Sequence, residues 1–483
     1  MRTLFSLALM LLPLCGFAQR VLTLEESLTL ACEQSPDARA ARHTFRAAYW
    51  NYRNYKANYL PSVTLNASPY LNRSISKVTQ GDGSVKYVEQ NLLSTDMSLS
   101  LTQNISFTGG TLSLESSLER LELFSSKSTS WQTAPVFLTY QQQLFGYNSL
   151  KWNKRLEPAK YIEAQRSYVE TVELVKQATV SRFFSLAMAQ SNLESARKNF
   201  AQADTLYRIA QGRYELGTIT ESDMLQLEVK RLNEETDLLN AGTQLDYAMQ
   251  SLKSYLGITS EDSIVIKTDS IVPIFAVSAA KALAIALERA PDVVAWQRRL
   301  TQADADVAYA KSQAGLKADI YLRFGLTQTA RRFEEAYRRP MDQQYVSIGL
   351  SLPILDWGRG KGRVKMAKSQ RDLVTTQVEQ AESDFEQNIR RIVAQFNMAA
   401  RRVGICRKAA ETAERHYDVA RRLYVMGKNT VLELNSALSE KDNARTAAVA
   451  ALEEYWSLYY TLRSLTLYDF ERNQEISGED AIE

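Results

Sequence analysis

The sequence contains two copies of one pattern, and any fold for this chain has to accommodate both. Residues 25–37 resemble residues 280–292, and both segments end in Pro-Asp, at an offset of 255 residues. Further along, Tyr214-x-x-Gly217 resembles Tyr424-x-x-Gly427 at an offset of 210 residues. Self-similarity of this kind predicts two structural repeats built from the same elements in the same order. Because the two offsets differ by 45 residues, the first repeat contains an extra segment of that length.

The extra segment lies between Leu65 and Phe137, where the offset changes. Within it, Met97–Thr102 alternates apolar and polar residues, and Thr108-Gly109-Gly110 is followed by a second alternating run. Two alternating runs on either side of Gly-Gly predict a β-hairpin.

The longest regular pattern predicts a single helix of about 65 residues in the second repeat. Apolar residues recur from Val374 to Tyr424 in 14 steps over 50 residues, between the 3.5-residue period of coiled coils and the 3.6-residue period of a straight helix. Only Gly404 interrupts the stretch from Val364 to Met426, and no proline does. At 1.5 Å per residue such a helix is roughly 100 Å long.

The first repeat is expected to contain a matching long helix from Pro158, a favourable first helical residue, to Leu216. Two shorter helices, Glu221–Leu256 and Val431–Leu467, then return antiparallel beside the long ones. They supply the partner that a long helix with a narrow apolar stripe requires.

Shorter runs in both repeats alternate as β-strands do, for example Val346–Ile354 and Ser62–Ala67. Four to six such strands cannot close a barrel, since small closed barrels need about eight. Open strand edges are not tolerated in lipid, so the pattern predicts that several chains share one barrel. Aromatic residues cluster in or beside these strands, as in membrane-interface girdles; the alternative is the core of an ordinary sandwich.

The first residues have the pattern of a secretory signal. A basic start is followed by the apolar run Leu4–Leu14 and by small residues around Ala18, which predicts a signal peptide over residues 1–18. A lipid anchor on Cys15 is an alternative. Cys32 and Cys406 are too few to form a disulfide framework.

Little in the sequence suggests catalysis. The formal net charge of +3 excludes a strongly basic nucleic-acid-binding protein. His43 and His416 stand alone, without the spacing of a metal site. The glycines of Gly358–Gly362 open a long helix after an apolar strand, which fits a chain turn better than a phosphate loop. The sequence therefore predicts no enzyme activity, no metal and no cofactor.

Taken together, these features resemble the TolC family of outer-membrane efflux channels. The resemblance rests on Val346–Ile354 with the following Leu355–Gly360, on the paired helix starts that end in Pro-Asp, and on the two Tyr-x-x-Gly turns. It implies a mixed α+β fold, mainly helical and built from two internal repeats. It further implies a homotrimeric outer-membrane β-barrel of twelve strands, four per chain, that continues into a long coiled-coil α-helical barrel in the periplasm.

The resemblance also implies a function and partners. The chain would be the passive exit duct for small molecules in a tripartite efflux pump, docked to a periplasmic adaptor (membrane fusion protein) and an inner-membrane transporter. The alternatives are the exit channel of a type I protein secretion system and, less favoured because it needs no strand pairs, a non-pore exported coiled-coil structural protein. The substrate and the transporter stay open.

The expected organisation follows from the repeats. Residues 19–257 form the first repeat, with the extra hairpin near 97–134, and residues 279–468 form the second. Residues 258–278 form a linker, and the polar tail 469–483 packs with it as an irregular belt. The hairpin either extends outside the cell or raises the strand count to six per chain and eighteen in total.

The two Tyr-x-x-Gly turns are expected to form a periplasmic tip with a gate and an adaptor-docking surface. The family has two acids three residues apart after the second turn and an Arg within it; here only Glu433 keeps its acid, because Ser436 and Asn429 occupy the other positions. In one hypothesis, Tyr424 donates to Asp223 as a latch beside a ring of carboxylates. In the other, both acids merely stabilise the starts of their helices. The expected tip residues are Gly217, Asp223, Tyr424, Gly427, Asn429, Glu433 and Ser436.

Overall fold

The computed structural model describes residues 20–259, 263–268 and 272–477. The predicted signal peptide, with Cys15, lies outside the described residues. So do residues 260–262 and 269–271 of the expected linker and residues 478–483 of the expected tail.

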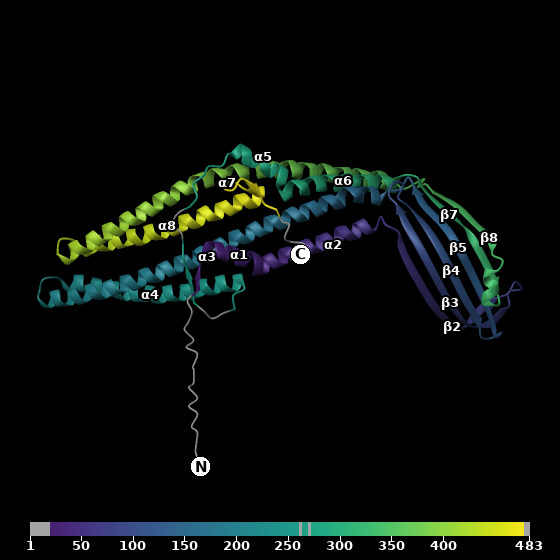
Figure 1. The fold of residues 1–483 in the computed structure, drawn as a ribbon, viewed down its shortest axis with the longest axis horizontal. Helices are drawn as coiled ribbons and strands as arrows, with labels where there is room; N and C mark the ends of the chain where they lie inside the picture. Colours follow the sequence, from purple (N-terminus) through teal and green to yellow (C-terminus); the bar gives the residue numbers. More distant parts are fainter. Residues whose placement is uncertain (1–19, 260–262, 269–271, 478–483) are drawn as a thin grey trace, which may run out of the picture. The chain divides into compact units, whose positions relative to one another are not determined.

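Each repeat consists of two helices, a set of strands, a very long helix and a returning helix, in that order (Figure 1). The first repeat comprises α1 (Leu24–Gln34), α2 (Pro36–Ala57), β2 (Ser62–Thr79), β3 (Val85–Ile105), β4 (Gly110–Leu123), β5 (Ser128–Leu144), α3 (Ser149–Glu215) and α4 (Glu221–Leu256). The second comprises α5 (Ala279–Arg289), α6 (Pro291–Ala314), β7 (Lys317–Ala330), β8 (Met341–Ser351), α7 (Arg359–Val425) and α8 (Val431–Thr466). The predicted mixed, mainly helical fold with two internal repeats is confirmed.

The chain divides into two compact units, and the division falls within α2, α3, α6 and α7. One unit contains Ala164–Val293 together with the residues before Ala47 and after Glu382. The other contains Ala47–Glu163 and Val294–Glu382, and therefore the whole β-sheet.

The long helices α3 and α7 have 67 residues each. The predicted start of α3 at Pro158 is wrong, because the helix begins nine residues earlier, at Ser149. The side chain of Asn148 accepts a hydrogen bond from the amide of Lys151 at 2.9 Å and so acts as the N-terminal cap. Pro158 consequently lies inside α3, where it cannot donate the helical hydrogen bond to the carbonyl of Lys154.

The returning helices match their predictions closely. α4 has the predicted bounds, and α8 ends at Thr466, one residue early, because Leu467 adopts a left-handed conformation with φ of 49°. Among the described residues, no helix combines the length and the apolar character that crossing a membrane requires.

Six antiparallel strands form one sheet in the order β2-β3-β4-β5-β7-β8. The predicted hairpin is confirmed as β3 and β4, joined by a turn in which Gly109 has a φ of +80°. The chain thus has six strands in this sheet, and the four implied by the resemblance are too few. β8 ends at Ser351 rather than at the predicted Ile354, since Pro353 has no N–H to continue the ladder.

The first of the two units has a core in which α1, α3 and α4 meet. Leu22, Ala31, Leu186, Leu252 and Ile264 are among its buried residues. Part of the expected irregular linker is ordered as a strand, β6 (Ile264–Ile266), which pairs in parallel with β1 (Arg20–Leu22). In the tail, β9 (Tyr468–Asp469) and β10 (Gln474–Glu475) pair antiparallel. Cys32 and Cys406 are free thiols.

Candidate functional site at the tips of the helical hairpins

The two tip turns have the same backbone geometry. At the first, Gly217 has a φ of +68°, and its amide and that of Thr218 donate to the carbonyls of Tyr214 (2.8 Å) and Arg213 (2.9 Å). At the second, Gly427 has a φ of +72°, and the equivalent bonds reach the carbonyls of Tyr424 and Leu423, each at 2.9 Å. Crossed hydrogen bonds around a left-handed residue end a helix tightly and favour glycine at that residue.

Each tip carboxylate caps the helix on which it lies. Asp223 accepts from the amide (3.3 Å) and the hydroxyl (2.7 Å) of Thr220, whose hydroxyl accepts from the amide of Asp223. Glu433 accepts from the amide (2.9 Å) and the hydroxyl (3.0 Å) of Thr430 in the same way. Hydrogen bonds from Thr430 lower the pKa of Glu433 below its usual value. Both acids therefore form capping boxes, which satisfy amides that would otherwise lack partners.

Tyr424 lies in an apolar cluster between α7 and α8. It is 9% exposed and packs with Tyr417, Ala420, Leu434 and Leu438. Burial raises the pKa of Tyr424, the guanidinium of Arg213 lowers it, and the carboxylate of Asp223 raises it. In the described part of the chain, the hydroxyl of Tyr424 makes no hydrogen bond to Asp223.

Arg213 is a tip residue that sequence reasoning missed. It belongs to the first repeat, yet a Cβ atom added at Gly427 of the second repeat would lie 3.7 Å from its Nη2. Arg213 therefore places a guanidinium near the second turn and lowers the pKa of Tyr424. The sequence did contain a signal for Arg213. At the offset of 210 residues it aligns with Leu423, so the first repeat has a cation where the second has an apolar residue.

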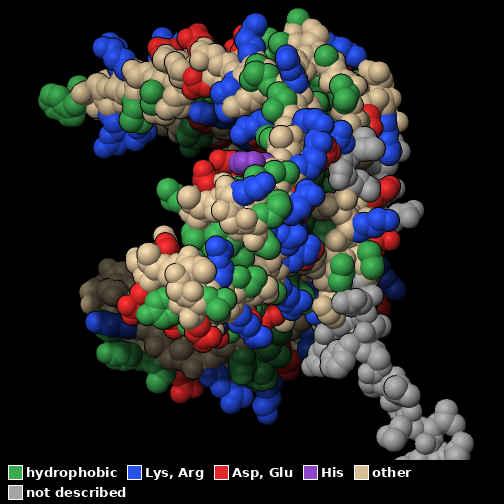
Figure 2. All heavy atoms as spheres, turned by 90° about the vertical axis from the view of Figure 1, so that its left-hand side faces the viewer, with side chains coloured by type: hydrophobic (Ala, Val, Ile, Leu, Met, Phe, Trp, Pro, Cys, Tyr) green, Lys and Arg blue, Asp and Glu red, His purple; other side chains and the backbone are tan. Residues whose placement is uncertain are grey.

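The remaining predicted tip residues are solvent-accessible. Asn429 is half-buried in the turn, and Ser436 is exposed on α8. Two apolar residues at equivalent positions, Leu216 and Met426, are 79% and 59% exposed. Figure 2 looks at the side of the molecule on which the helical hairpins end and shows hydrophobic side chains among basic and acidic ones. Each tip therefore presents an apolar side chain beside charged groups.

A polar layer joins the two repeats behind the tips. The buried ammonium of Lys441 on α8 lies 4.4 Å from the ring centroid of Tyr417 and 3.3 Å from Oδ1 of Asn199 on α3. Asn199 in turn donates to Asp442 at 3.0 Å. Burial raises the pKa of Tyr417 to about 12, so its hydroxyl stays protonated and donates to Gln202.

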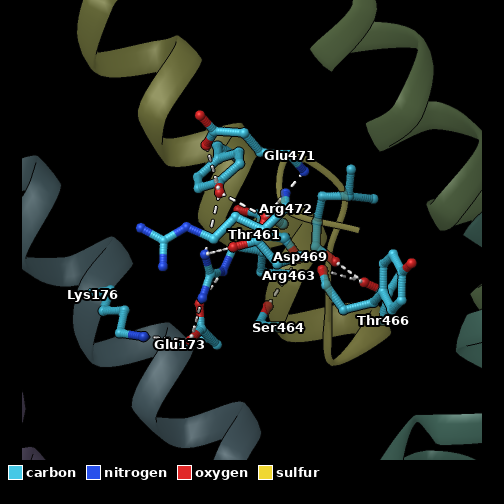
Figure 3. A network of polar contacts seen from close by, with 12 residues as sticks. Glu173, Lys176, Thr461, Arg463, Ser464, Thr466, Asp469, Glu471 and Arg472 are labelled. Carbon is cyan, nitrogen blue, oxygen red and sulfur yellow. Dashed lines mark hydrogen bonds and ion pairs between the residues drawn. The ribbon is translucent and has the colours of Figure 1, made fainter. Parts of the chain in front are cut away.

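A buried network of charges joins α3 to α8 and the tail farther from the tips (Figure 3). Glu173 is fully buried and accepts from Arg463 at 2.7 Å and 3.2 Å and from Lys176 at 2.6 Å. Arg463 also donates to the buried Asp469 at 2.7 Å, and Tyr459 donates to the same carboxylate at 3.0 Å. Burial alone would lower the pKa of Arg463, yet its pairing with Glu173 raises it.

The described residues contain no cluster of His, Cys, Asp and Glu suited to a metal ion. His416 lies 3.2 Å from Glu440 in an exposed pair, away from other ligand-type side chains.

Removing either capping hydroxyl is expected to loosen the start of its helix. Thr220→Ala or Thr430→Ala costs about 1 kcal/mol of local stability, because the amide of the third helical residue loses its acceptor. Hydrogen exchange of the first-turn amides of α4 or α8 is expected to rise roughly fivefold, the equivalent of that energy. Ser436→Ala is the control, since this exposed hydroxyl makes no hydrogen bond in the described part of the chain. Equal exchange in all three variants contradicts the capping role.

Comparison with protein families gives one broad match. The model of a family described as outer membrane efflux protein matches residues 28–258 and 282–466, which cover both repeats. No curated relative matches the sequence.

Three solved structures of outer-membrane proteins share the fold at low sequence identity. The CmeC outer membrane channel of Campylobacter jejuni is 15% identical, with a TM-score of 0.66 over 92% of this chain and 85% of that one. The outer membrane protein VceC of Vibrio cholerae is 16% identical, with a TM-score of 0.62 over 92% and 95%. The MtrE outer membrane channel of Neisseria gonorrhoeae, solved in its open state, is 14% identical, with a TM-score of 0.61 over 92% and 88%.

Proposed function

Because this chain belongs to the outer membrane efflux protein family, we propose that it is the channel subunit of a tripartite efflux pump, a passive exit duct for small molecules. Membership of this family confirms the resemblance seen in the sequence and makes the chain an outer-membrane efflux channel protein rather than an enzyme. The observation that carries the proposal is the combination of a sheet with two free edges and paired long helices in one chain.

The sheet supports assembly into a homotrimer. Its outermost strands, β2 and β8, each pair on one side only. Apolar side chains on both are exposed in the single chain, including Val63, Leu65, Ile348 and Leu350. A free edge with apolar side chains is stable in lipid only when another strand covers it, so copies of the chain have to complete one another. The helices would then line a periplasmic tunnel below the shared barrel.

The tips support docking of a periplasmic adaptor, which would connect the channel to an inner-membrane transporter. Leu216 and Met426 are exposed apolar residues on two turns of equal geometry. Charged groups surround them, as in small interfaces that combine an apolar centre with a polar rim.

Assembly and pore formation test the proposal directly. The purified mature chain is expected to run as a trimer in detergent and to form discrete ion channels in planar bilayers. Deletion of its gene is expected to sensitise cells to exported compounds. A chain that is a single subunit without detergent, and that forms no channels, would overturn the proposal.

We further propose that Tyr424, Asp223 and Arg213 hold the two tips of one chain together and keep the entrance narrow. Tyr424 is buried, and both Arg213 and Asp223 of the other repeat shift its pKa, so loss of its hydroxyl and of Asp223 is expected to weaken the contact between repeats. Tyr424→Phe combined with Asp223→Ala is expected to raise single-channel conductance about twofold or more, since the pore constriction controls the ion current.

Two controls separate this latch from simpler effects. Tyr214→Phe changes the equivalent but exposed tyrosine of the first repeat and is expected to leave conductance unchanged. Thr220→Ala removes the helix cap that Asp223→Ala also disturbs, while it keeps the charge of Asp223. Unchanged conductance in the double variant, or an equal rise in Thr220→Ala, counts against the latch.

A further inference from the structure

The hairpin β3–β4 has no counterpart in the second repeat. By sequence offset, β2 corresponds to β7 and β5 to β8, so β3 and β4 are the inserted pair. The insertion does not project from the sheet, because its strands continue the ladder between β2 and β5 (Figure 1). β3 pairs with β2 from Thr102 opposite Ser62 to Val85 opposite Thr79, and β4 pairs with β5 along most of its length.

An apolar band crosses all six strands on one face of the sheet. One row of paired residues runs from Val63 to Leu101, Leu114, Leu138 and Phe324. A neighbouring row of paired residues runs through Leu112, Tyr140, Leu322 and Val346. Leu99, Leu101, Leu112 and Leu114 of the hairpin are exposed, as are Val346 and Ile348 of β8. The hairpin therefore has an apolar surface suited to contact with lipid, and this surface lies level with that of the neighbouring strands along the strand direction.

The opposite face of the sheet is polar. A hollow of about 370 Å³ on this face is lined by side chains of all six strands, among them Asn66, Ser98, Glu115, Gln132, Arg323 and Gln343. Alternation of an apolar and a polar face along every strand, the inserted ones included, is the pattern of a barrel that surrounds water.

The unit that contains the sheet also contains the adjoining ends of four helices, which contact one another in the order α2, α3, α6, α7. Tyr52 stacks on Tyr161, with ring centroids 4.7 Å apart. Arg298 donates to Glu163 at 3.1 Å, and Arg299 donates to Gln377 at 3.0 Å.

The hairpin makes the sheet as wide as this row of helices. Six strands spaced about 4.8 Å apart and tilted by about 40° cover roughly 38 Å of wall, and four strands cover only roughly 25 Å. Four helices spaced about 9 Å apart cover roughly 36 Å. A wall of six strands thus continues the helical wall without a step in circumference.

From these observations we propose that the hairpin β3–β4 is a wall element of a barrel of eighteen strands shared by three copies of this chain. In this barrel, the free edge of β8 in one copy pairs with the free edge of β2 in the next. Consecutive strands of the sheet alternate in direction, so β2 and β8 run oppositely and can pair antiparallel across the subunit boundary. The inference rests on the trimeric channel proposed above and replaces the twelve strands that the resemblance implies.

Disulfide trapping tests the edge pairing. In a full-length background without Cys32 and Cys406, one cysteine is placed within residues 63–67 of β2 and one within residues 346–350 of β8. Oxidation is expected to yield covalent dimers and trimers for at least one register. Leu65→Cys with Leu99→Cys is the control, since these residues pair within one chain and should cross-link without forming oligomers. Oxidised monomers for every β2–β8 pair contradict the proposed edge.

Electron cryomicroscopy of the trimer then counts the strands. Eighteen strands, with β3 and β4 in the wall, are the expected result. A trimer with a twelve-stranded barrel and a hairpin outside the wall overturns this inference and leaves the channel proposal intact. A chain that never assembles overturns both. Replacing residues 80–127 by a short turn, which joins the ends of β2 and β5 that lie on the same side of the sheet, is expected to lower the yield of detergent-stable trimer severalfold, because it removes two of the six wall strands of each copy.

Discussion

Neutralising the carboxylates that the hairpin β3–β4 brings to the polar face of the sheet is expected to remove most of the cation preference of the channel. Asp96 and Glu119 both accept from the hydroxyl of Ser94, at 3.3 Å and 3.2 Å, and are therefore close together. Glu115 lies 3.9 Å from Arg323, the one basic residue among those that line the hollow. Each copy of the chain thus contributes three acids and one base to this surface, and the three copies of the proposed trimer would form a strongly acidic ring.

The measurement is the reversal potential in asymmetric KCl for the variant D96N/E115Q/E119Q. The cation-to-anion permeability ratio is expected to fall by a factor of about two to five in 0.1 M salt, where the Debye length is about 10 Å, and to change little in 1 M salt. Single changes on β4 provide matched variants. Glu119→Gln alters the polar face. Glu122→Gln alters a side chain on the opposite face of the same strand, where Glu122 pairs with Arg120. An equal effect of both, or no effect of the triple variant, contradicts the assignment of the faces.

Removing Arg463 is expected to produce the largest loss of stability in the helical part of the chain. Arg463→Met leaves the fully buried Glu173 with Lys176 alone and deprives the buried Asp469 of its cation. Breaking a buried ion pair from one side costs about 3–5 kcal/mol, because the remaining charge stays desolvated. We expect a lower urea midpoint for loss of helical circular dichroism.

Two comparisons make this experiment specific. Arg402→Met removes an exposed pair with Glu454, likewise between a long helix and α8 but on α7 instead of α3, and is expected to cost at most about 1 kcal/mol. The triple variant R463M/E173Q/D469N removes the charges together and is expected to recover part of the loss. If Arg463→Met and Arg402→Met shift the midpoint equally, the buried network does not stabilise the fold.

The elements that the sequence predicted well are those with strong local signals. The bounds of α4 follow from Gly217 before it and Gly257 after it, and the hairpin β3–β4 follows from alternation around Gly109. The start of α3 was missed because proline usually marks a first turn, whereas here the side chain of Asn148 begins the helix and Pro158 lies inside it.

The candidate site was predictable in position but only partly in chemistry. The paired Tyr-x-x-Gly turns located both tips, and the places of Asp223 and Glu433 near the starts of their helices already suggested that these acids stabilise the helix starts. Arg213 was missed because its effect on Tyr424 crosses between repeats, and such a contact depends on how the hairpins pack. Likewise, the strand pairing alone decided that the inserted hairpin belongs to the sheet.

Pro158 makes the two repeats mechanically unequal. Its position in α3 corresponds to Lys368 in α7, which keeps its amide, so only one of the two long helices has a gap in its backbone hydrogen bonding there. In a ring of three chains, the more flexible α3 and the stiffer α7 would alternate around the helical barrel. A twist applied to this barrel would then bend the three copies of α3 more than the three copies of α7, so the deformation would have threefold rather than sixfold symmetry.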